Sequence, residues 1–379
     1  MRLGFLQALL LGAALSLGLA GSIAAFETTG REAILIDDTT GAVLMEKNAD
    51  QLMPPSSMSK IMTVYMVFER LRDGSIKLTD ELPISERAWR MQGSKMFVDV
   101  NSRVSVDALL HGVIVQSGND ATVALAEGLG GTEEAFAARM TERAHELGMT
   151  NSTFLNASGW PQEGHLTTAR DLATLASHMI HDFPEFYPLF AETEYEYNGI
   201  SQGNRNPLLY KNVGADGLKT GHTEEAGYGL TASAVRDGRR LILVVNGLGD
   251  VNTRSEETER LLDWGFRETT NYALIKADEP VVDADVWHGD TETVPLVLAE
   301  PLVVTLTREA RAGMTVKVIY DGPLPAPIAK GTQVGRIVVS APGYTDVEHP
   351  LLAGTDVGTL STLRRLLAAA VYLVRGGGG

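Results

Sequence analysis

Apolar residues recur along the first two thirds of the chain with the spacings of both helices and strands. The run Ile61–Leu71 is apolar on nearly every side, which predicts a buried helix that ends at Arg72-Asp73-Gly74. Further helices are predicted at Val104–Gln116, Asp120–Leu129, Glu133–Leu147, Thr168–His181 and Ser255–Phe266. Strands are predicted at Ala33–Ile36, Ala42–Met45, Asp216–Thr223, Gly227–Val235 and Arg239–Val245. We therefore expect an α+β fold in which helices flank an antiparallel sheet.

The pattern changes from about Asp278, where short apolar runs alternate with Gly and Pro turns. The runs are Val281-Val282, Val294–Leu298, Leu302–Leu306, Val316–Tyr320 and Val334–Val339. Short strands at this spacing are typical of a small all-β domain. We place that domain at residues 276–356, after a first domain at residues 26–275.

Each end of the chain carries an apolar segment of its own. Arg2 precedes the apolar run Leu3–Leu19 and small residues at 20–25, the pattern of a signal peptide at residues 1–25. A retained membrane anchor is the alternative. At the other end, Leu360–Arg375 combines an apolar helical face with three arginines. Its longest uncharged run is too short to span a bilayer. We interpret residues 357–379 as an amphipathic membrane-anchor helix and a disordered tail, with a helix packed on the β domain as the alternative.

Composition narrows the possible functions. The formal net charge of -16 argues against nucleic-acid binding, which needs a basic surface. The chain has no cysteine, so it has no disulfide and no thiolate site. His111, His178 and His181 lie on predicted helices without acidic partners at metal-ligand spacing, and no Gly-rich phosphate loop follows a strand. We therefore expect no cofactor and no metal.

Ser57 and Lys60 stand where the Ile61–Leu71 helix opens and form the pattern Ser-x-x-Lys. A spacing of three stacks the hydroxyl and the amine on one helical face, near the positive end of the helix dipole. This arrangement suits a nucleophile with an adjacent amine base. The pattern alone is weak, because Ser56 or Ser57 could cap the helix while Lys60 lies in solvent.

Two later motifs strengthen the hypothesis of a catalytic site. Ser117-Gly118-Asn119 lies between two predicted helices, where a loop would direct a hydroxyl and an amide into a cleft. Lys219-Thr220-Gly221 lies early on a predicted strand, and Gly221 would allow close approach of a substrate backbone. Together with Ser57 and Lys60, these motifs make up the signature of penicillin-binding proteins and class A β-lactamases, with Ser-Gly-Asn in place of Ser-Asp-Asn.

The chain resembles the low-molecular-mass penicillin-binding proteins, serine-type D-alanyl-D-alanine carboxypeptidases of the penicillin-binding protein 5 kind. The resemblance runs from about Ala33 to Leu373 and includes Gly203–Asn206 and Asp216–Thr223. It implies a β-lactamase/transpeptidase-like domain, a C-terminal β domain and an amphipathic anchor. One departure is the segment between Trp89 and Gly93, which looks several residues shorter than in the family and puts turnover of bound acyl groups in doubt.

The chemistry follows residue by residue from these motifs. Ser57 would attack the carbonyl between two terminal D-alanines, with Lys60 as base once burial and the charge of Lys219 lower its pKa. Ser117 would shuttle the proton and Asn119 would donate its amide to the substrate. The resemblance implies an oxyanion hole at the backbone N–H groups of Ser57 and His222. The candidates for binding the substrate carboxylate are Thr220, Arg254 and Arg205. Asp182 matches an acidic family position linked to His222, or is an ordinary helix residue.

The expected substrates are pentapeptide stems of peptidoglycan, with β-lactam antibiotics as covalent inhibitors. The expected location is the periplasm, at the outer face of the inner membrane, with Leu360–Arg375 on the membrane surface. Three alternatives stay open: a β-lactamase, an endopeptidase or transpeptidase with the same motifs, and a non-catalytic wall-binding protein. No Glu-x-x-Leu-Asn stretch is present to supply a lactamase deacylation glutamate.

Overall fold

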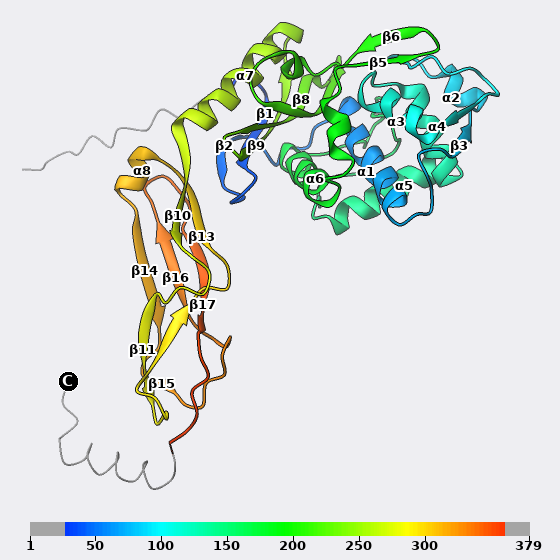
Figure 1. Ribbon diagram of the computed structural model, residues 1–379. Coiled ribbons are helices and arrows are strands. Elements are labelled where there is room, and N and C mark those ends of the chain that lie inside the picture. Colours follow the sequence, from blue (N-terminus) through cyan, green and yellow to red (C-terminus); the bar gives the residue numbers. More distant parts are fainter. Residues whose placement is uncertain (1–26, 361–379) are drawn as a thin grey trace, which may run out of the picture.

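The computed structural model describes residues 27–360, arranged as a helix-rich domain followed by an elongated β domain (Figure 1). The predicted signal peptide lies outside the described residues, and so does the predicted anchor segment beyond Leu360. The predicted start of that segment at residue 357 is wrong, because Val357 bridges to Ile328, Thr359 bridges to Gly289, and the Leu360 N–H donates to the His288 carbonyl oxygen, all within the β domain.

A five-stranded antiparallel sheet organises the first domain, in the order β2-β1-β9-β8-β7. The strands of this domain are β1 (Glu32–Asp37), β2 (Val43–Lys47), β3 (Glu81–Pro83), β4 (Arg103–Ser105), β5 (Glu194–Tyr197), β6 (Ile200–Gly203), β7 (Ala215–Thr223), β8 (Gly227–Arg236) and β9 (Arg239–Leu248). Its helical segments are η1 (Ser56–Ser59), α1 (Lys60–Arg72), α2 (Glu86–Arg90), α3 (Val106–Ile114), α4 (Asn119–Gly130), α5 (Glu133–Glu146), α6 (Ala169–Asp182), η2 (Tyr187–Ala191), η3 (Pro207–Tyr210) and α7 (Val251–Glu268).

Alternating residues of the central strands face two separate cores. Ile34 of β1 and Ile242 of β9 pack into the larger core, with α1 and α6. Leu35 and Leu243 point to the other face, where α7 covers the sheet. Strand β7 is one edge of this sheet, and no further strand pairs with it among the described residues.

Capping side chains explain most helix starts. Ser105, Thr132 and Thr168 each accept a backbone N–H three residues on, which begins α3, α5 and α6. Asp250 accepts from Asn252 and Thr253, so α7 begins at Val251, four residues before the predicted start.

The second domain is a β sandwich. Its elements are β10 (Thr269–Ile275), β11 (Val282–Trp287), β12 (Thr293–Val297), β13 (Leu302–Thr307), α8 (Arg308–Ala312), β14 (Thr315–Tyr320), β15 (Leu324–Pro325), β16 (Gln333–Ser340) and β17 (Val347–Ala353). A six-stranded sheet β14-β16-β17-β12-β11-β15 packs against the pair β10-β13. Because β10 pairs with β13, the junction between the domains lies at Glu268–Thr269, before the predicted boundary at residue 275.

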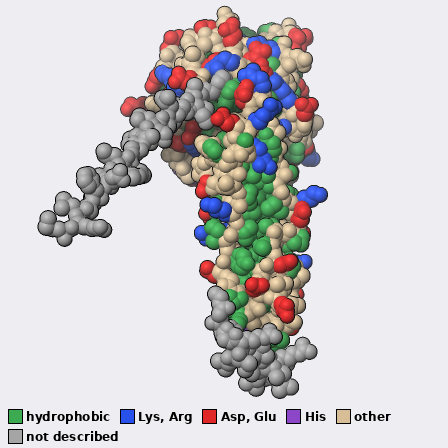
Figure 2. All heavy atoms as spheres, turned by 90° about the vertical axis from the view of Figure 1, so that its left-hand side faces the viewer, with side chains coloured by type: hydrophobic (Ala, Val, Ile, Leu, Met, Phe, Trp, Pro, Cys, Tyr) green, Lys and Arg blue, Asp and Glu red, His purple; other side chains and the backbone are tan. Residues whose placement is uncertain are grey.

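Hydrophobic side chains follow one exposed face of this sandwich (Figure 2). Val316 and Val318 of the edge strand β14 are exposed hydrophobic residues. Apolar side chains are therefore exposed to solvent at this edge of the sandwich.

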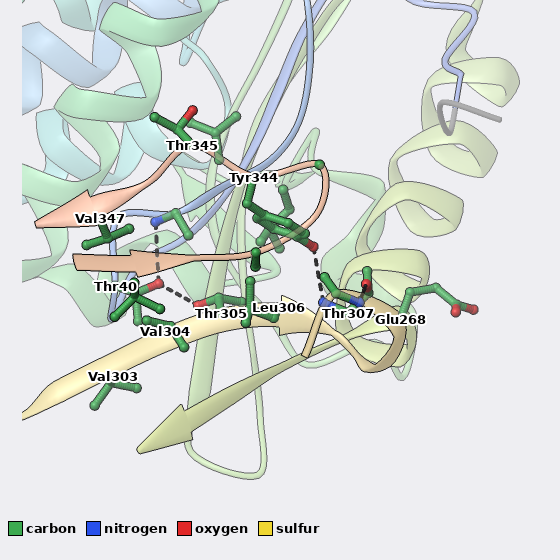
Figure 3. Close-up of a pocket in the computed structure, with 18 of the residues that line it drawn as sticks. Thr40, Glu268, Val303, Val304, Thr305, Leu306, Thr307, Tyr344, Thr345 and Val347 are labelled. Carbon is green, nitrogen blue, oxygen red and sulfur yellow. Dashed lines mark hydrogen bonds between the residues drawn. The ribbon is translucent and has the colours of Figure 1, made fainter. Parts of the chain in front are cut away.

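The two domains meet at a groove of about 1930 Å³ between the β1–β2 turn, the end of α7 and β13. Figure 3 shows Thr40 directed toward Thr305, and their hydroxyls lie 2.5 Å apart. Asn271 of β10 also donates to the Asp37 carboxylate at 3.2 Å. Polar contacts between side chains therefore join the β domain to β1 of the five-stranded sheet and to the turn that follows β1.

Candidate active site

The three motifs predicted to act together meet beside the edge strand β7. Ser57 lies in the 3-10 turn η1, and Lys60 is the first residue of α1. Ser117 precedes α4 with a positive φ of 60°, and Asn119 opens that helix. A β-carbon at Gly221 would lie 3.1 Å from the carbonyl oxygen of Pro55, so glycine lets β7 pack directly on the nucleophile turn. This close approach is an intramolecular reason for Gly221, beside the substrate contact predicted from the sequence.

Lys60 is fully buried, and its amine makes three contacts. Its Nζ lies 3.0 Å from Ser57 Oγ, 2.7 Å from Asn119 Oδ1 and 2.7 Å from the carbonyl oxygen of Ser158. The Asn119 and Ser158 oxygens are acceptors only. A neutral amine gives them its two hydrogens and directs its lone pair at the Ser57 hydroxyl, which is the geometry that a base requires.

Burial lowers the pKa of Lys60 to about 7, although the negative charges of Asp120 and Glu133 act in the opposite direction. From the sequence we expected burial and the charge of Lys219 to lower the pKa of Lys60 together. In the structure, burial is the main cause. The pKa of Lys219 itself lies well below its usual value, through burial and repulsion from Lys60, Arg254 and Arg205.

Asn119 is held in place by its own amide. Its Nδ2 donates to the carbonyl oxygen of Gln92 at 2.6 Å, while Oδ1 accepts from Lys60. The segment between Trp89 and Gly93, which looks shorter than in the family, therefore contacts the site directly. One Nδ2 hydrogen has no acceptor among the described residues, as the predicted donation to a substrate carbonyl requires.

Cations gather on the far side of the cleft. Lys219 and Thr220 are almost fully buried on β7, and Arg254 is buried in the first turn of α7. Within residues 27–360, neither Lys219 Nζ nor the Arg254 guanidinium has a hydrogen-bond acceptor, and Arg254 Nε is wholly enclosed. Arg205, which is exposed, adds its charge nearby. Such a cluster can receive an anion.

His222 and Asp182 do not contact one another. The exposed His222 ring stacks on Tyr228, with centroids 3.9 Å apart. Asp182 Oδ2 instead accepts the Tyr65 hydroxyl at 2.7 Å and lies 3.1 Å from His178 Nδ1. In the part of the chain that the structure describes, no three His, Asp or Glu side chains are grouped as metal ligands.

Two groups near Lys60 were not foreseen. The Ser158 carbonyl is a backbone group, and a backbone group leaves no signal in the sequence. His165 Nδ1 accepts the Leu155 N–H at 3.2 Å, so its Nε2 carries the proton and donates to Ser59 Oγ at 2.8 Å. Burial and the charge of Lys60 lower the pKa of His165 to about 4, which keeps the ring neutral.

Comparisons with known proteins agree with this geometry. The D-alanyl-D-alanine carboxypeptidase model, peptidase S11, matches residues 20–249, and the penicillin-binding protein 5 C-terminal domain model matches residues 270–359. The chain is 41% identical over 332 residues to D-alanyl-D-alanine carboxypeptidase DacC of Escherichia coli strain K12, across 86% of this chain and 83% of DacC.

Solved structures give the same picture. Penicillin binding protein 5 from Haemophilus influenzae superposes with a TM-score of 0.80 at 37% identity, over 88% of this chain and 98% of that one. Penicillin-binding protein D2 from Listeria monocytogenes, solved in its ampicillin-bound form, matches 63% of this chain and 97% of its own, with a TM-score of 0.58 and 32% identity. The predicted penicillin-binding-protein fold, enzyme class and family are confirmed. This chain belongs to the D-alanyl-D-alanine carboxypeptidase family, peptidase S11, and its β domain is a penicillin-binding protein 5 C-terminal domain.

Proposed function

We propose that this enzyme removes the terminal D-alanine from peptidoglycan stem peptides through an acyl-enzyme on Ser57. The observation that carries the proposal is the 3.0 Å contact between Lys60 Nζ and Ser57 Oγ, with both other contacts of the amine made by acceptors. Because the pKa of Lys60 is about 7, a large fraction of the amine is neutral at neutral pH.

Acylation begins when Lys60 takes the Ser57 proton. The freed Oγ attacks the carbonyl carbon of the penultimate D-alanine, and a tetrahedral oxyanion forms. We assign its stabilisation to the backbone N–H groups of Ser57 and His222. As the C–N bond breaks, the proton passes through Ser117 to the leaving amine and free D-alanine departs. Attack by water on the ester then releases the shortened peptide and restores the Ser57 hydroxyl.

The free edge of β7 suggests how the substrate lies. An extended peptide can pair with the outward backbone groups of Gly221–Thr223, as an added strand does. Its terminal carboxylate would then reach Thr220, Lys219 and Arg254, and neither Lys219 nor Arg254 has an anionic partner among residues 27–360. The substrate supplies the negative charge that this side of the cleft is missing.

A β-lactam tests the nucleophile, because its strained amide and its carboxylate present the same two groups. Incubation with penicillin should add one adduct in intact-mass spectrometry, and peptide mapping should locate it on Ser57. An adduct on Ser56, Ser59 or Ser117 would contradict the assignment. Release of D-alanine from a soluble D-Ala-D-Ala peptide should disappear in parallel with acylation.

We also infer that the mature enzyme works in the periplasm, attached to the membrane surface through Leu360–Arg375. The two terminal sequence patterns support the inference. Within residues 27–360, no helix is long and apolar enough to cross a bilayer. The described chain ends at the tip of the β domain away from the catalytic domain (Figure 1). Deleting Leu360–Gly379 should release the protein from membranes with D-alanine release unchanged. Continued membrane association, or lost folding, would assign the segment to the β domain instead.

A further inference from the structure

The carbonyl of Ser158 is the least expected ligand of the Lys60 amine, and its position is fixed from two sides. The preceding residue, Ala157, gives its carbonyl to Thr63 Oγ1 at 2.7 Å. The backbone N–H of Ala157 donates to Glu133 Oε1 at 3.1 Å. A helix residue and a buried carboxylate therefore hold Ala157, the residue before Ser158, by its carbonyl and its N–H respectively.

Glu133 is an unusual residue to find at this position. It is the first residue of α5, where the helix dipole favours any acidic side chain. The neighbouring Glu134 also lies in the first turn, where it can interact favourably with the helix dipole while its side chain is 65% exposed to solvent. The Glu133 side chain, in contrast, is 4% exposed and turned inward. The dipole alone does not explain a buried carboxylate, because burying one is costly unless it is paired.

Arg87 supplies the partner. Its Nη2 lies 2.6 Å from Glu133 Oε2, and its Nη1 lies 2.7 Å from Glu134 Oε1. The arginine itself is half exposed. The two oxygens of Glu133 thus have separate partners: Arg87 on the outer side and the Ala157 N–H on the inner side.

The charges around Lys60 are few. Asp120 faces it from α4, but its carboxylate already accepts backbone N–H groups from Met96, Phe97, Val98 and Ala121. Lys219 faces it from β7, and His165 faces it from the loop after Gly159 as a neutral ring. Among the described residues, Glu133 is the other negative charge that acts on Lys60, and of the two only Glu133 forms an ion pair with a partly exposed side chain, Arg87.

We propose that Glu133, held by Arg87, is a positioning residue for Lys60: it fixes the Ser158 carbonyl against the amine and sets how strongly that amine holds its proton. The inference rests on the proposed role of Lys60 as the base. It predicts that two residues outside the three motifs control the pH at which the enzyme becomes active.

Glu133→Gln is the main test, since the amide oxygen can still accept from Ala157 while the charge is lost. Without that charge the protonated amine is less stabilised, so neutral Lys60 persists to lower pH. The acidic limb of the rate of acylation by penicillin, measured from about pH 5 to about pH 9, should move down by about one pH unit. The matched control Glu134→Gln removes an equal charge from solvent and should leave the limb in place.

Arg87→Gln should move the limb in the opposite direction, to higher pH, because the Glu133 charge is then uncompensated. This half-exposed position also provides a folded variant if Glu133→Gln proves unstable, and melting temperatures are recorded for all three proteins. A limb that stays at the wild-type pH in both Glu133→Gln and Arg87→Gln overturns the proposal. So does an equal shift in Glu134→Gln.

Lys60→Ala separates this inference from the proposed function. Acylation of that variant at the wild-type rate would remove Lys60 as the base, and the proposed mechanism with it. Loss of acylation in Lys60→Ala, together with an unshifted limb in Glu133→Gln, would overturn only the role of Glu133.

Discussion

Two regions of this enzyme bury charged side chains, and they treat those charges in opposite ways. At the domain junction, Asp37 is wholly buried and accepts from the backbone of Thr39 and Thr40, from Asn271 Nδ2 and from Arg239 Nε at 2.7 Å. Arg239 in turn donates to the carbonyl oxygen and the hydroxyl of Thr269. The two charges of this pair, Asp37 and Arg239, therefore neutralise one another.

In the catalytic cleft, buried Lys219 has no acceptor among the described residues, and neither has Arg254 Nε. An unpaired buried charge costs several kcal/mol, so a fold keeps one only where something else gains. At the junction, the Asp37–Arg239 ion pair helps to hold β10 against β1. In the cleft, we infer that the basic groups lack a protein partner because they bind the carboxylate of a substrate.

Lys219→Met should produce the largest difference between the two regions. Removing the cation should slow acylation by peptide and penicillin alike by on the order of 100-fold. Because the burial that lowers the pKa of Lys219 also costs the folded state free energy, replacing the amine with an apolar side chain should raise the free energy of unfolding by about 1 kcal/mol. Stopped-flow acylation and urea denaturation measure the two effects. Lys211→Met is the matched control, since Lys211 pairs with Glu259 and lies outside the cleft. A less stable Lys219→Met protein would show that this lysine is structural.

Asp37→Asn should do the reverse. The substitution leaves Arg239 without its charged partner in a buried setting, which should lower the free energy of unfolding by about 3 kcal/mol. Acylation of Ser57 should change by less than about twofold, because no hydrogen bond of Asp37 involves the cleft. Urea midpoints beside acylation rates test both halves. A large loss of activity with unchanged stability would mean that the junction controls the cleft.

The same contrast explains what the sequence could predict. Ser57, Lys60, Ser117, Asn119 and Lys219 belong to short motifs in a fixed order, so their convergence could be expected before any coordinates. Asp37 and Glu133 carry no motif. Each looks like an ordinary acid, at a strand end and a helix start respectively, and only the tertiary contacts give it a role.

The β domain shows a second limit of predicting structure from the sequence. Its apolar runs predicted β12, β13, β14, β16 and the start of β11, but β10, β15 and β17 were missed. The sequence of β17 is interrupted by His349 and Pro350, and proline within a run argues against a central strand. Pairing with β16 and β12 overrides that local preference, which a search for alternating residues does not detect.

Arg254→Ala should give the smallest of the three effects and is the most informative about the substrate. Arg254 lies in the first turn of α7, with its guanidinium carbon 5.7 Å from the centre of the Tyr228 ring. If it binds the terminal carboxylate in both ground and transition states, its loss should raise KM for a D-Ala-D-Ala peptide about tenfold and change kcat by less than about threefold. Unfolding stability should stay the same or rise slightly, because the buried Nε has no partner to lose. Arg205→Ala, at an exposed position, is the matched comparison and should raise KM less. Unchanged kinetic constants in Arg254→Ala would move the carboxylate site to Thr220 and Lys219, and the unpaired guanidinium would then need another explanation.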